Sequence, residues 1–148
     1  MARFLELAMP QLEVWACELN PISRMRLSER YPDLRLLGAR IENLAPDMKF
    51  DLVYCSHVVE HIWDLDPFLQ SLSRILSPNG AALFLTPDGE CPQLPKEGLA
   101  WWGFIVPHHC QIFTRRGLTA ALERNGFALQ DTGSELDQEF WALAKRTP

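Results

Sequence analysis

Short apolar runs alternate with amphipathic stretches along most of the chain. Runs with the composition of buried strands cover residues 12–17, 34–37, 50–56 and 81–87. Stretches with helical spacing or helix start and stop signals cover residues 21–31, 66–76 and 114–125. Strands that alternate with helices are typical of a mainly parallel sheet with helices on both faces, because parallel neighbours need a crossover connection. The pattern therefore predicts a doubly wound α/β fold.

Prolines mark several expected starts and ends of helices. Pro21 suits the first turn of a helix, and Asp66 followed by Pro67 suits an N-cap and the first helical position. The triplet at residues 78–80, Pro-Asn-Gly, is expected to end the second helix and to lead into the next strand.

The C-terminal part of the chain predicts an antiparallel pair. Gly126 suits the end of the last helix, and residues 127–131 and 139–145 have the composition of strands. The polar stretch at residues 132–137 would be the turn between them. We therefore expect a hairpin at one edge of the sheet.

Residues 88–113 differ from the rest of the chain in composition. They combine several prolines and glycines with Trp101, Trp102 and Phe104. This mixture favours an ordered loop over a free linker. We expect a lid or a substrate loop there.

Length, composition and charge restrict the class of protein. The 148 residues, 47% of them hydrophobic, predict a single domain over residues 1–148. The net charge is −5, and no block of basic residues could follow a phosphate backbone, so we expect no nucleic-acid partner. The chain has neither the run of about 18–20 apolar residues that spans a membrane nor the layout of a signal peptide. A cytoplasmic protein with no membrane partner is expected.

The cysteines and histidines do not form a recognisable metal motif. The four cysteines are irregularly spaced and include no C-x-x-C pair. His108 and His109 are adjacent, and neighbouring side chains on an extended segment point to opposite faces, so they would not readily share one ion. No metal site is predicted.

Several motifs together resemble the class I S-adenosylmethionine-dependent methyltransferases that act on small molecules, including the ubiquinone-biosynthesis type. The matching pieces are FDLV at residues 50–53, VVEH at 58–61, Asp66-Pro67, RILSPNG at 74–80 and Thr86-Pro87. The stretch HHCQIFTRRGLTAALERNGF at residues 108–127 resembles a further family segment, and the terminal hairpin matches the family's edge hairpin. The resemblance implies a Rossmann-like sheet, S-adenosylmethionine as cofactor and a small-molecule methyl acceptor.

The beginning of the chain departs from the family pattern. A first strand and a glycine-rich turn usually precede a helix like the one expected at residues 3–8, which Pro10 ends, and Met1 stands where the last glycine would be. We therefore expect an N-terminally truncated domain. The missing strand is the central one of the family sheet, so a second copy or a partner chain is expected to complete the sheet, unless the true start lies upstream.

The resemblance assigns a set of cofactor-binding residues. They lie at or directly after the C-terminal ends of three successive strands: Glu18, Leu19, Arg40, Ile41, Cys55, Ser56 and His57. Glu18 would accept hydrogen bonds from the ribose hydroxyls, although it could also cap a helix or be a solvated acid. Ile41 could pack on adenine or simply on the core, and Ser56 could cap the next helix.

The expected catalytic residues are Glu60, His61 and His109. His61 has a pKa range suitable for a general base, whereas the Glu60-His61 pair could also serve only to fix a loop. His109 or its neighbour His108 could orient or deprotonate the acceptor. Trp101, Trp102 and Phe104 could form an apolar wall for the acceptor or pack within the lid.

Two classes of function are consistent with these features. The first is a methyltransferase that transfers a methyl group to oxygen, nitrogen or carbon of a small molecule. The alternative is a shortened, non-catalytic relative that acts as an interaction or regulatory subunit, for which the missing glycine-rich turn is the main reason. A nicotinamide-dependent oxidoreductase would share the acidic residue after the strand, but it would not explain the VVEH motif or the hairpin.

Overall fold

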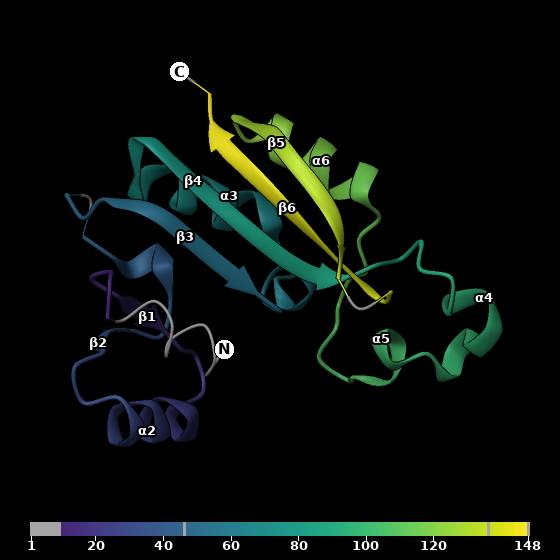
Figure 1. Cartoon of the computed structure of the whole chain (residues 1–148), viewed down its shortest axis with the longest axis horizontal. Helices are drawn as coiled ribbons and strands as arrows, with labels where there is room; N and C mark the ends of the chain where they lie inside the picture. Colours follow the sequence, from purple (N-terminus) through teal and green to yellow (C-terminus); the bar gives the residue numbers. More distant parts are fainter. Residues whose placement is uncertain (1–9, 46, 136, 148) are drawn as a thin grey trace. The chain divides into compact units, whose positions relative to one another are not determined.

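A computed structural model describes residues 10–45, 47–135 and 137–147 (Figure 1). The helix expected at residues 3–8 and the position of Met1 lie outside the described residues. The chain divides into two compact units, residues 1–45 and 46–148.

The N-terminal unit contains a small parallel sheet. Its elements in chain order are β1 (Trp15–Cys17), α2 (Pro21–Arg30), β2 (Arg35–Gly38) and the 3-10 helix η1 (Ile41–Asn43). β1 pairs with β2 in parallel, as predicted from the crossover helix between them. β1 is shorter than the predicted residues 12–17, because pairing with β2 begins only at Trp15. Pro21 occupies the first turn of α2, and the Asn20 side chain accepts hydrogen bonds from two backbone amides, so this predicted helix start is confirmed.

The C-terminal unit is built on a four-stranded mixed sheet in the order β3-β4-β6-β5 (Figure 1). The strands are β3 (Phe50–Ser56), β4 (Leu76–Pro87), β5 (Phe127–Glu135) and β6 (Glu139–Arg146). β3 and β4 are parallel, whereas β6 runs antiparallel to both β4 and β5. The predicted α/β class and the C-terminal antiparallel hairpin are confirmed. The hairpin strands are longer than predicted, because β5 continues to Glu135, which pairs with Glu139.

Two helices, α3 (Leu65–Ile75) and α6 (Arg115–Arg124), lie on one face of this sheet (Figure 1). Each helix buries an apolar stripe, including Leu69 and Leu72 on α3 and Leu118 and Leu122 on α6. Burial of each such side chain contributes about 1.5–3 kcal/mol, so this stripe forms much of the core. Among residues 10–45, 47–135 and 137–147, no helix combines the length and the apolar character needed to cross a membrane.

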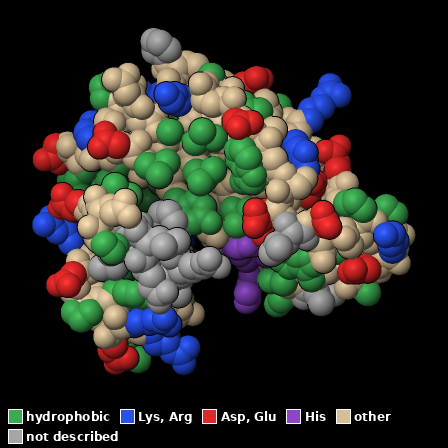
Figure 2. All heavy atoms as spheres, viewed as in Figure 1, with side chains coloured by type: hydrophobic (Ala, Val, Ile, Leu, Met, Phe, Trp, Pro, Cys, Tyr) green, Lys and Arg blue, Asp and Glu red, His purple; other side chains and the backbone are tan. Residues whose placement is uncertain are grey.

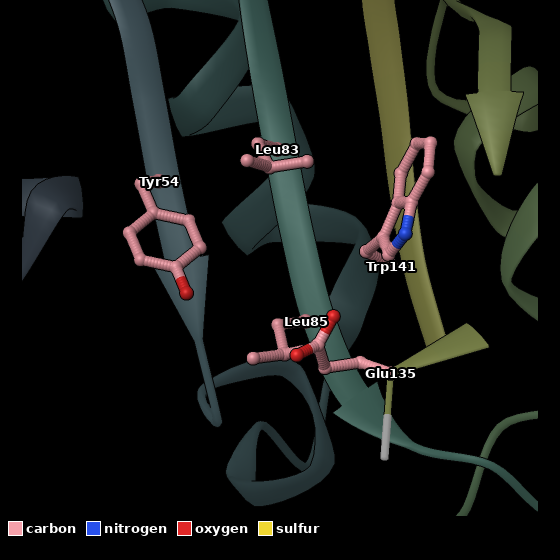
Figure 3. A pocket seen from close by; sticks show the side chains of 5 residues that line it. All are labelled: Tyr54, Leu83, Leu85, Glu135 and Trp141. Atoms are coloured by element: carbon pink, nitrogen blue, oxygen red, sulfur yellow. The ribbon is translucent and has the colours of Figure 1, made fainter. Parts of the chain in front are cut away.

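Alternation along the strands separates the two sheet faces. The residues buried on the helix side include Cys55, Ala82, Phe84, Phe140, Ala142 and Ala144. Their neighbours Tyr54, Leu83, Leu85 and Trp141 point to the other face and are half-buried. These four side chains and Glu135 line a hollow of about 500 Å³ (Figure 3). Figure 2 shows hydrophobic side chains gathered over this part of the sheet.

The prediction that residues 78–80 end the helix and precede the next strand is wrong. These residues belong to β4, which begins at Leu76 directly after α3. The register changes between the pairs Phe50–Leu76 and Leu52–Ala81, so the Pro-Asn-Gly triplet forms an irregularity inside the strand. Gly80 is required there, because a Cβ atom would lie 2.9 Å from the carbonyl oxygen of Phe50.

The predicted start of α3 at Asp66 is also wrong. The helix begins at Leu65, and Asp64 occupies the N-cap position without a capping hydrogen bond from its side chain. The Asp66 carboxylate instead accepts hydrogen bonds from Arg124 Nη2 at 2.7 Å and Asn125 Nδ2 at 2.8 Å. Asp66 therefore links the start of α3 to the end of α6.

This link between Asp66 and the end of α6 should make the stability of the fold depend on pH at low pH. The hydrogen bond from Arg124, followed by that from Asn125, lowers the pKa of Asp66 in the folded chain. The ionised Asp66 carboxylate contributes fully to the free energy of unfolding above the ordinary carboxyl pKa of about 3.9. This contribution is lost as pH falls through the lower pKa of the folded chain. Urea unfolding of Asp66→Asn should therefore show a small loss of stability at pH 6 that shrinks at lower pH. Asp64→Asn is the matched control, and an equal pH dependence in both variants would contradict the assignment.

Candidate functional site

The turn after β3 has an unusual backbone. His57 adopts a positive φ of 51°, which is rare for a residue with a side chain and costs of order 1–3 kcal/mol. Its backbone amide donates to the carbonyl oxygen of Leu85 on β4 at 2.9 Å, which holds the turn against the neighbouring strand. Because β3 and β4 are parallel, their C-terminal ends meet at the same edge of the sheet. This is where open α/β sheets place their ligands.

Glu60 is completely buried at this edge, in the 3-10 helix η2 (Val59–His61). Its Oε1 accepts a hydrogen bond from His57 Nδ1 at 3.1 Å, and its Oε2 accepts one from the hydroxyl of Thr86 at 3.0 Å. Thr86 is also completely buried. A buried carboxylate is costly unless it is paired and hydrogen-bonded, and Glu60 satisfies both conditions.

His57 lies between two carboxylates. Its Nδ1 faces Glu60, and its Nε2 is 3.4 Å from Glu139 Oε1. The hydrogen bond to Glu60 is the main reason that the pKa of His57 is raised, and the charge of Glu139 adds to it against the opposing effect of burial. Burial raises the pKa of Glu139, although the charge of His57 opposes this effect. The His57 imidazolium is therefore stabilised at this edge.

The segment around Gln111 fixes η2 in place. The carbonyl oxygen of Glu60 accepts hydrogen bonds from the backbone amides of Cys110 at 2.9 Å and Gln111 at 3.3 Å. The Gln111 side-chain amide donates to the carbonyl oxygens of Val59 and Ile62, which flank the Glu60-His61 pair. This segment therefore fixes the backbone of the Glu60-His61 pair, and the catalytic role of the two side chains stays a prediction.

The three predicted catalytic residues come together. Glu60, His61 and His109 each offer a ligand atom, and these atoms all lie within 4.8 Å of one another. The His61 and His109 ring centroids are 4.7 Å apart at an interplanar angle of 62°. His108 contributes its carbonyl oxygen, which accepts a hydrogen bond from His61 Nδ1 at 2.9 Å. Figure 2 shows that histidine side chains reach the surface of the molecule.

The segment at residues 88–113 contains more regular structure than its composition predicts. It forms the short helices α4 (Leu94–Glu97), η3 (Gly98–Ala100) and α5 (Trp102–Ile105). Trp101 is completely buried and donates its indole N–H to Gln138 Oε1 at 3.2 Å. Trp102 is half-buried, with its ring centroid 6.1 Å from that of His57 and 5.8 Å from that of His109. The two tryptophans therefore have different surroundings.

The predicted cofactor residues belong to both units. Glu18, Leu19, Arg40 and Ile41 lie in the N-terminal unit, after the ends of β1 and β2. Leu19 and Arg40 are exposed, whereas Glu18 and Ile41 are half-buried. Glu18 Oε1 accepts a hydrogen bond from the amide of Asn20 at 2.8 Å, so Glu18 helps to form the turn before α2.

The other three predicted cofactor residues lie at the end of β3 in the C-terminal unit. Ser56 and His57 are half-buried, but Cys55 is 5% exposed and faces the helix side of the sheet. A direct contact of the Cys55 side chain with a ligand is therefore disfavoured. Whether the residues of the two units face one common ligand stays a prediction.

Sequence reasoning missed three residues that organise this site. Thr86 appeared only as part of a family motif, Gln111 only as a spacer, and Glu139 only as the start of a strand. Their roles depend on contacts with η2 and His57 across 26, 52 and 82 positions of the chain. Periodicity and local motifs carry no signal for such contacts.

Comparisons with known proteins agree with this fold and with the motifs. A family model described as a methyltransferase domain matches residues 4–132. A probable S-adenosylmethionine-dependent methyltransferase of Mycolicibacterium smegmatis is 31% identical over 104 residues, which are 70% of this chain and 38% of that protein. A ubiquinone biosynthesis O-methyltransferase of Rickettsia prowazekii is 36% identical over 53 residues, which are 36% of this chain and 21% of that protein. The chain thus spans well under half the length of these curated relatives.

Solved structures confirm the fold. The Burkholderia thailandensis 1,6-didemethyltoxoflavin-N1-methyltransferase, solved with 1,6-didemethyltoxoflavin and S-adenosylhomocysteine, gives a TM-score of 0.72 at 18% identity. The match covers 99% of this chain and 65% of that one. With the family model matching most of the sequence, the chain belongs to the methyltransferase-domain family of class I S-adenosylmethionine-dependent methyltransferases.

Proposed function

We propose that this protein transfers a methyl group from S-adenosylmethionine to a small-molecule acceptor. The observation that carries the proposal is the match of the methyltransferase-domain model to residues 4–132. The names of two similar proteins, an O-methyltransferase of ubiquinone biosynthesis and an N1-methyltransferase of a toxoflavin precursor, support a small acceptor. No comparison supports the non-catalytic alternative.

The residues after β1 and β2 fit the nucleoside end of the cofactor. A carboxylate suits a vicinal diol because its two oxygens only accept hydrogen bonds, and together they can accept about four. The bond from Asn20 uses one of these positions on Glu18, which leaves capacity for the ribose hydroxyls. Ile41 offers an apolar surface for adenine, with Leu19 and Arg40 beside the same strand ends.

The end of β3 and the catalytic cluster fit the reacting end. Ser56 and His57 would line the methionine part of the cofactor, which supplies a methyl group on an already activated sulfonium. An acceptor hydroxyl or amine must also lose a proton, and the imidazoles of His61 and His109 are the groups that could take it. Trp102, close to His109, offers an aromatic surface to the acceptor. We therefore expect an apolar, ring-containing acceptor.

Calorimetric titration of the 148-residue chain with S-adenosylmethionine and S-adenosylhomocysteine tests the proposal. We expect binding that Glu18→Gln weakens by about 10- to 100-fold, because hydrogen bonds to a charged group contribute about 1.5–3 kcal/mol. Glu29→Gln is the matched control, since Glu29 is an exposed acid on α2. Transfer of a labelled methyl group to a panel of phenols and amines would then identify the acceptor class. A folded chain that binds neither cofactor form would refute the proposal.

A further inference from the structure

We propose that Glu60, His61 and His109 form a binding site for a divalent transition-metal ion. Their ligand atoms already lie within 4.8 Å of one another. Ligands about 2.0–2.1 Å from a tetrahedral zinc ion are roughly 3.4 Å apart, so side-chain movements of about 1 Å would complete the geometry. Two imidazoles and one carboxylate are a common catalytic zinc set.

The hydrogen bonds of the two rings prepare them for this role. His61 Nδ1 is 2.9 Å from the carbonyl oxygen of His108, and His109 Nδ1 is 2.8 Å from that of Gly103. A carbonyl oxygen only accepts hydrogen bonds, so in each neutral ring Nδ1 carries the proton and Nε2 keeps its lone pair. Metal-binding histidines typically show this arrangement, in which the second ring nitrogen donates to a carbonyl or carboxylate group.

Glu60 supplies the negative charge that the site needs. Both of its oxygens are held, by His57 and by Thr86, yet each carboxylate oxygen can accept more than one partner. The backbone of Glu60 is also fixed, because its carbonyl oxygen accepts hydrogen bonds from the backbone amides of Cys110 and Gln111. The carboxylate is thus oriented before any ion binds, as in metal sites whose ligands have hydrogen-bonded partners behind them.

The donor set selects the kind of metal. Imidazole nitrogens favour zinc, cobalt or nickel, whereas magnesium and calcium prefer oxygen ligands. Three protein ligands leave a coordination position open, and an acceptor oxygen placed there would lose its proton more easily. In this form His61 and His109 act as ligands instead of as general bases, and the proton of the acceptor passes to solvent water.

This cluster differs from the adjacent pair His108 and His109, for which the sequence predicts no shared metal ion. Among the described residues, the cluster of possible ligands includes His109 but not His108. The site instead joins the Glu60-His61 pair of η2 to His109, 48 positions along the chain from His61. A bound ion would therefore also tie the end of the segment at residues 88–113 to η2.

Titration of the untagged, metal-depleted 148-residue chain with Zn²⁺ and Co²⁺, without cofactor or acceptor, tests the inference. We expect one ion per chain, a rise in melting temperature, and the visible absorption of four- or five-coordinate Co²⁺. His61→Ala and His109→Ala should each weaken binding at least about tenfold, a loss of about 1.4 kcal/mol. Mg²⁺ should bind far more weakly.

Two variants serve as controls. His108→Ala removes a neighbouring imidazole outside the set, and Cys110→Ser removes a nearby thiol whose Sγ donates to the Glu60 carbonyl oxygen. Both should bind Zn²⁺ as tightly as the unchanged chain. Circular dichroism would establish that all variants fold. The inference is overturned if Zn²⁺ does not bind, if Mg²⁺ binds equally well, or if either control loses as much affinity as His109→Ala. These outcomes leave the methyltransferase proposal intact, because neither the cofactor nor the acceptor is present.

Discussion

Replacing Glu60 with methionine is expected to lower the free energy of unfolding by about 2–4 kcal/mol. Methionine has a similar size, but it cannot accept the hydrogen bonds from His57 and from the buried hydroxyl of Thr86. Hydrogen bonds to a charged group contribute about 1.5–3 kcal/mol each, and a buried donor without a partner adds a further cost. The expected loss in the free energy of unfolding is below the sum of these values, because the His57 side chain is 36% exposed and can bind water instead.

A double-mutant cycle with Thr86→Val would separate the buried hydrogen bond between Thr86 and Glu60 from the other effects of replacing Glu60. Urea unfolding of the two single variants and the double variant should give a coupling free energy of about 1–2 kcal/mol between residues 60 and 86. Glu60→Gln is a useful intermediate, because it keeps the volume and an acceptor oxygen but removes the charge. If Glu60→Met were as stable as the unchanged chain, or if the coupling were zero, the buried carboxylate would not hold this edge of the sheet.

The sequence predicts the regular parts of this fold well, because their signals are local. β3 has the predicted bounds, residues 50–56, because its apolar run lies between polar neighbours. Only Cys55 in it is buried, whereas Asp51 and Leu52 are exposed, so the predicted burial of this strand is wrong. The start of α6 at Thr114 and its end near Gly126 follow from capping chemistry: Thr114 Oγ1 accepts a hydrogen bond from the Gly117 amide, and Gly126 has a φ of 77°.

The errors arise where a distant contact replaces a local rule. Asp66 has the sequence context of an N-cap, but its carboxylate binds Arg124 and Asn125 at the far end of α6. The triplet at residues 78–80 has the composition of a turn, but strand pairing with β3 continues on both sides of it. In both places tertiary contacts outweigh local propensity.

The candidate site shows the same division. The family motif identified Glu60 and His61, and the stretch before Phe113 identified His109, but only the fold shows that these side chains meet. The positive φ of His57 and the support from Thr86 and Gln111 could not be predicted, because each depends on contacts between segments remote in sequence. Residue types with chemical function were therefore predictable, whereas their partners were not.

Substitution of the two adjacent tryptophans is expected to have different effects. Loss of Trp101 should lower stability, whereas loss of Trp102 should mainly weaken acceptor binding. Trp101→Ala removes a completely buried ring, whose centroid lies 5.4 Å from that of Phe104 in an edge-on arrangement. It also removes the indole N–H that donates to Gln138 Oε1. A Cβ at Gly103 would overlap this ring, so the packing around it is tight. Loss of a buried tryptophan costs about 3–5 kcal/mol, and here the cost falls on the segment at residues 88–113. Hydrogen exchange should rise strongly in α4 and α5 and much less in β4 and β6.

Trp102→Ala should leave stability within about 1 kcal/mol, because the ring is half-buried and no described residue forms a hydrogen bond with its side chain. Its ring lies near those of His57 and His109, so under the proposed function its loss should raise KM for the acceptor with little change in cofactor affinity. Hydrogen exchange and acceptor kinetics on both variants distinguish the roles. If Trp102→Ala loosened the segment as much as Trp101→Ala, Trp102 would be a packing residue and the aromatic wall would have to be sought elsewhere.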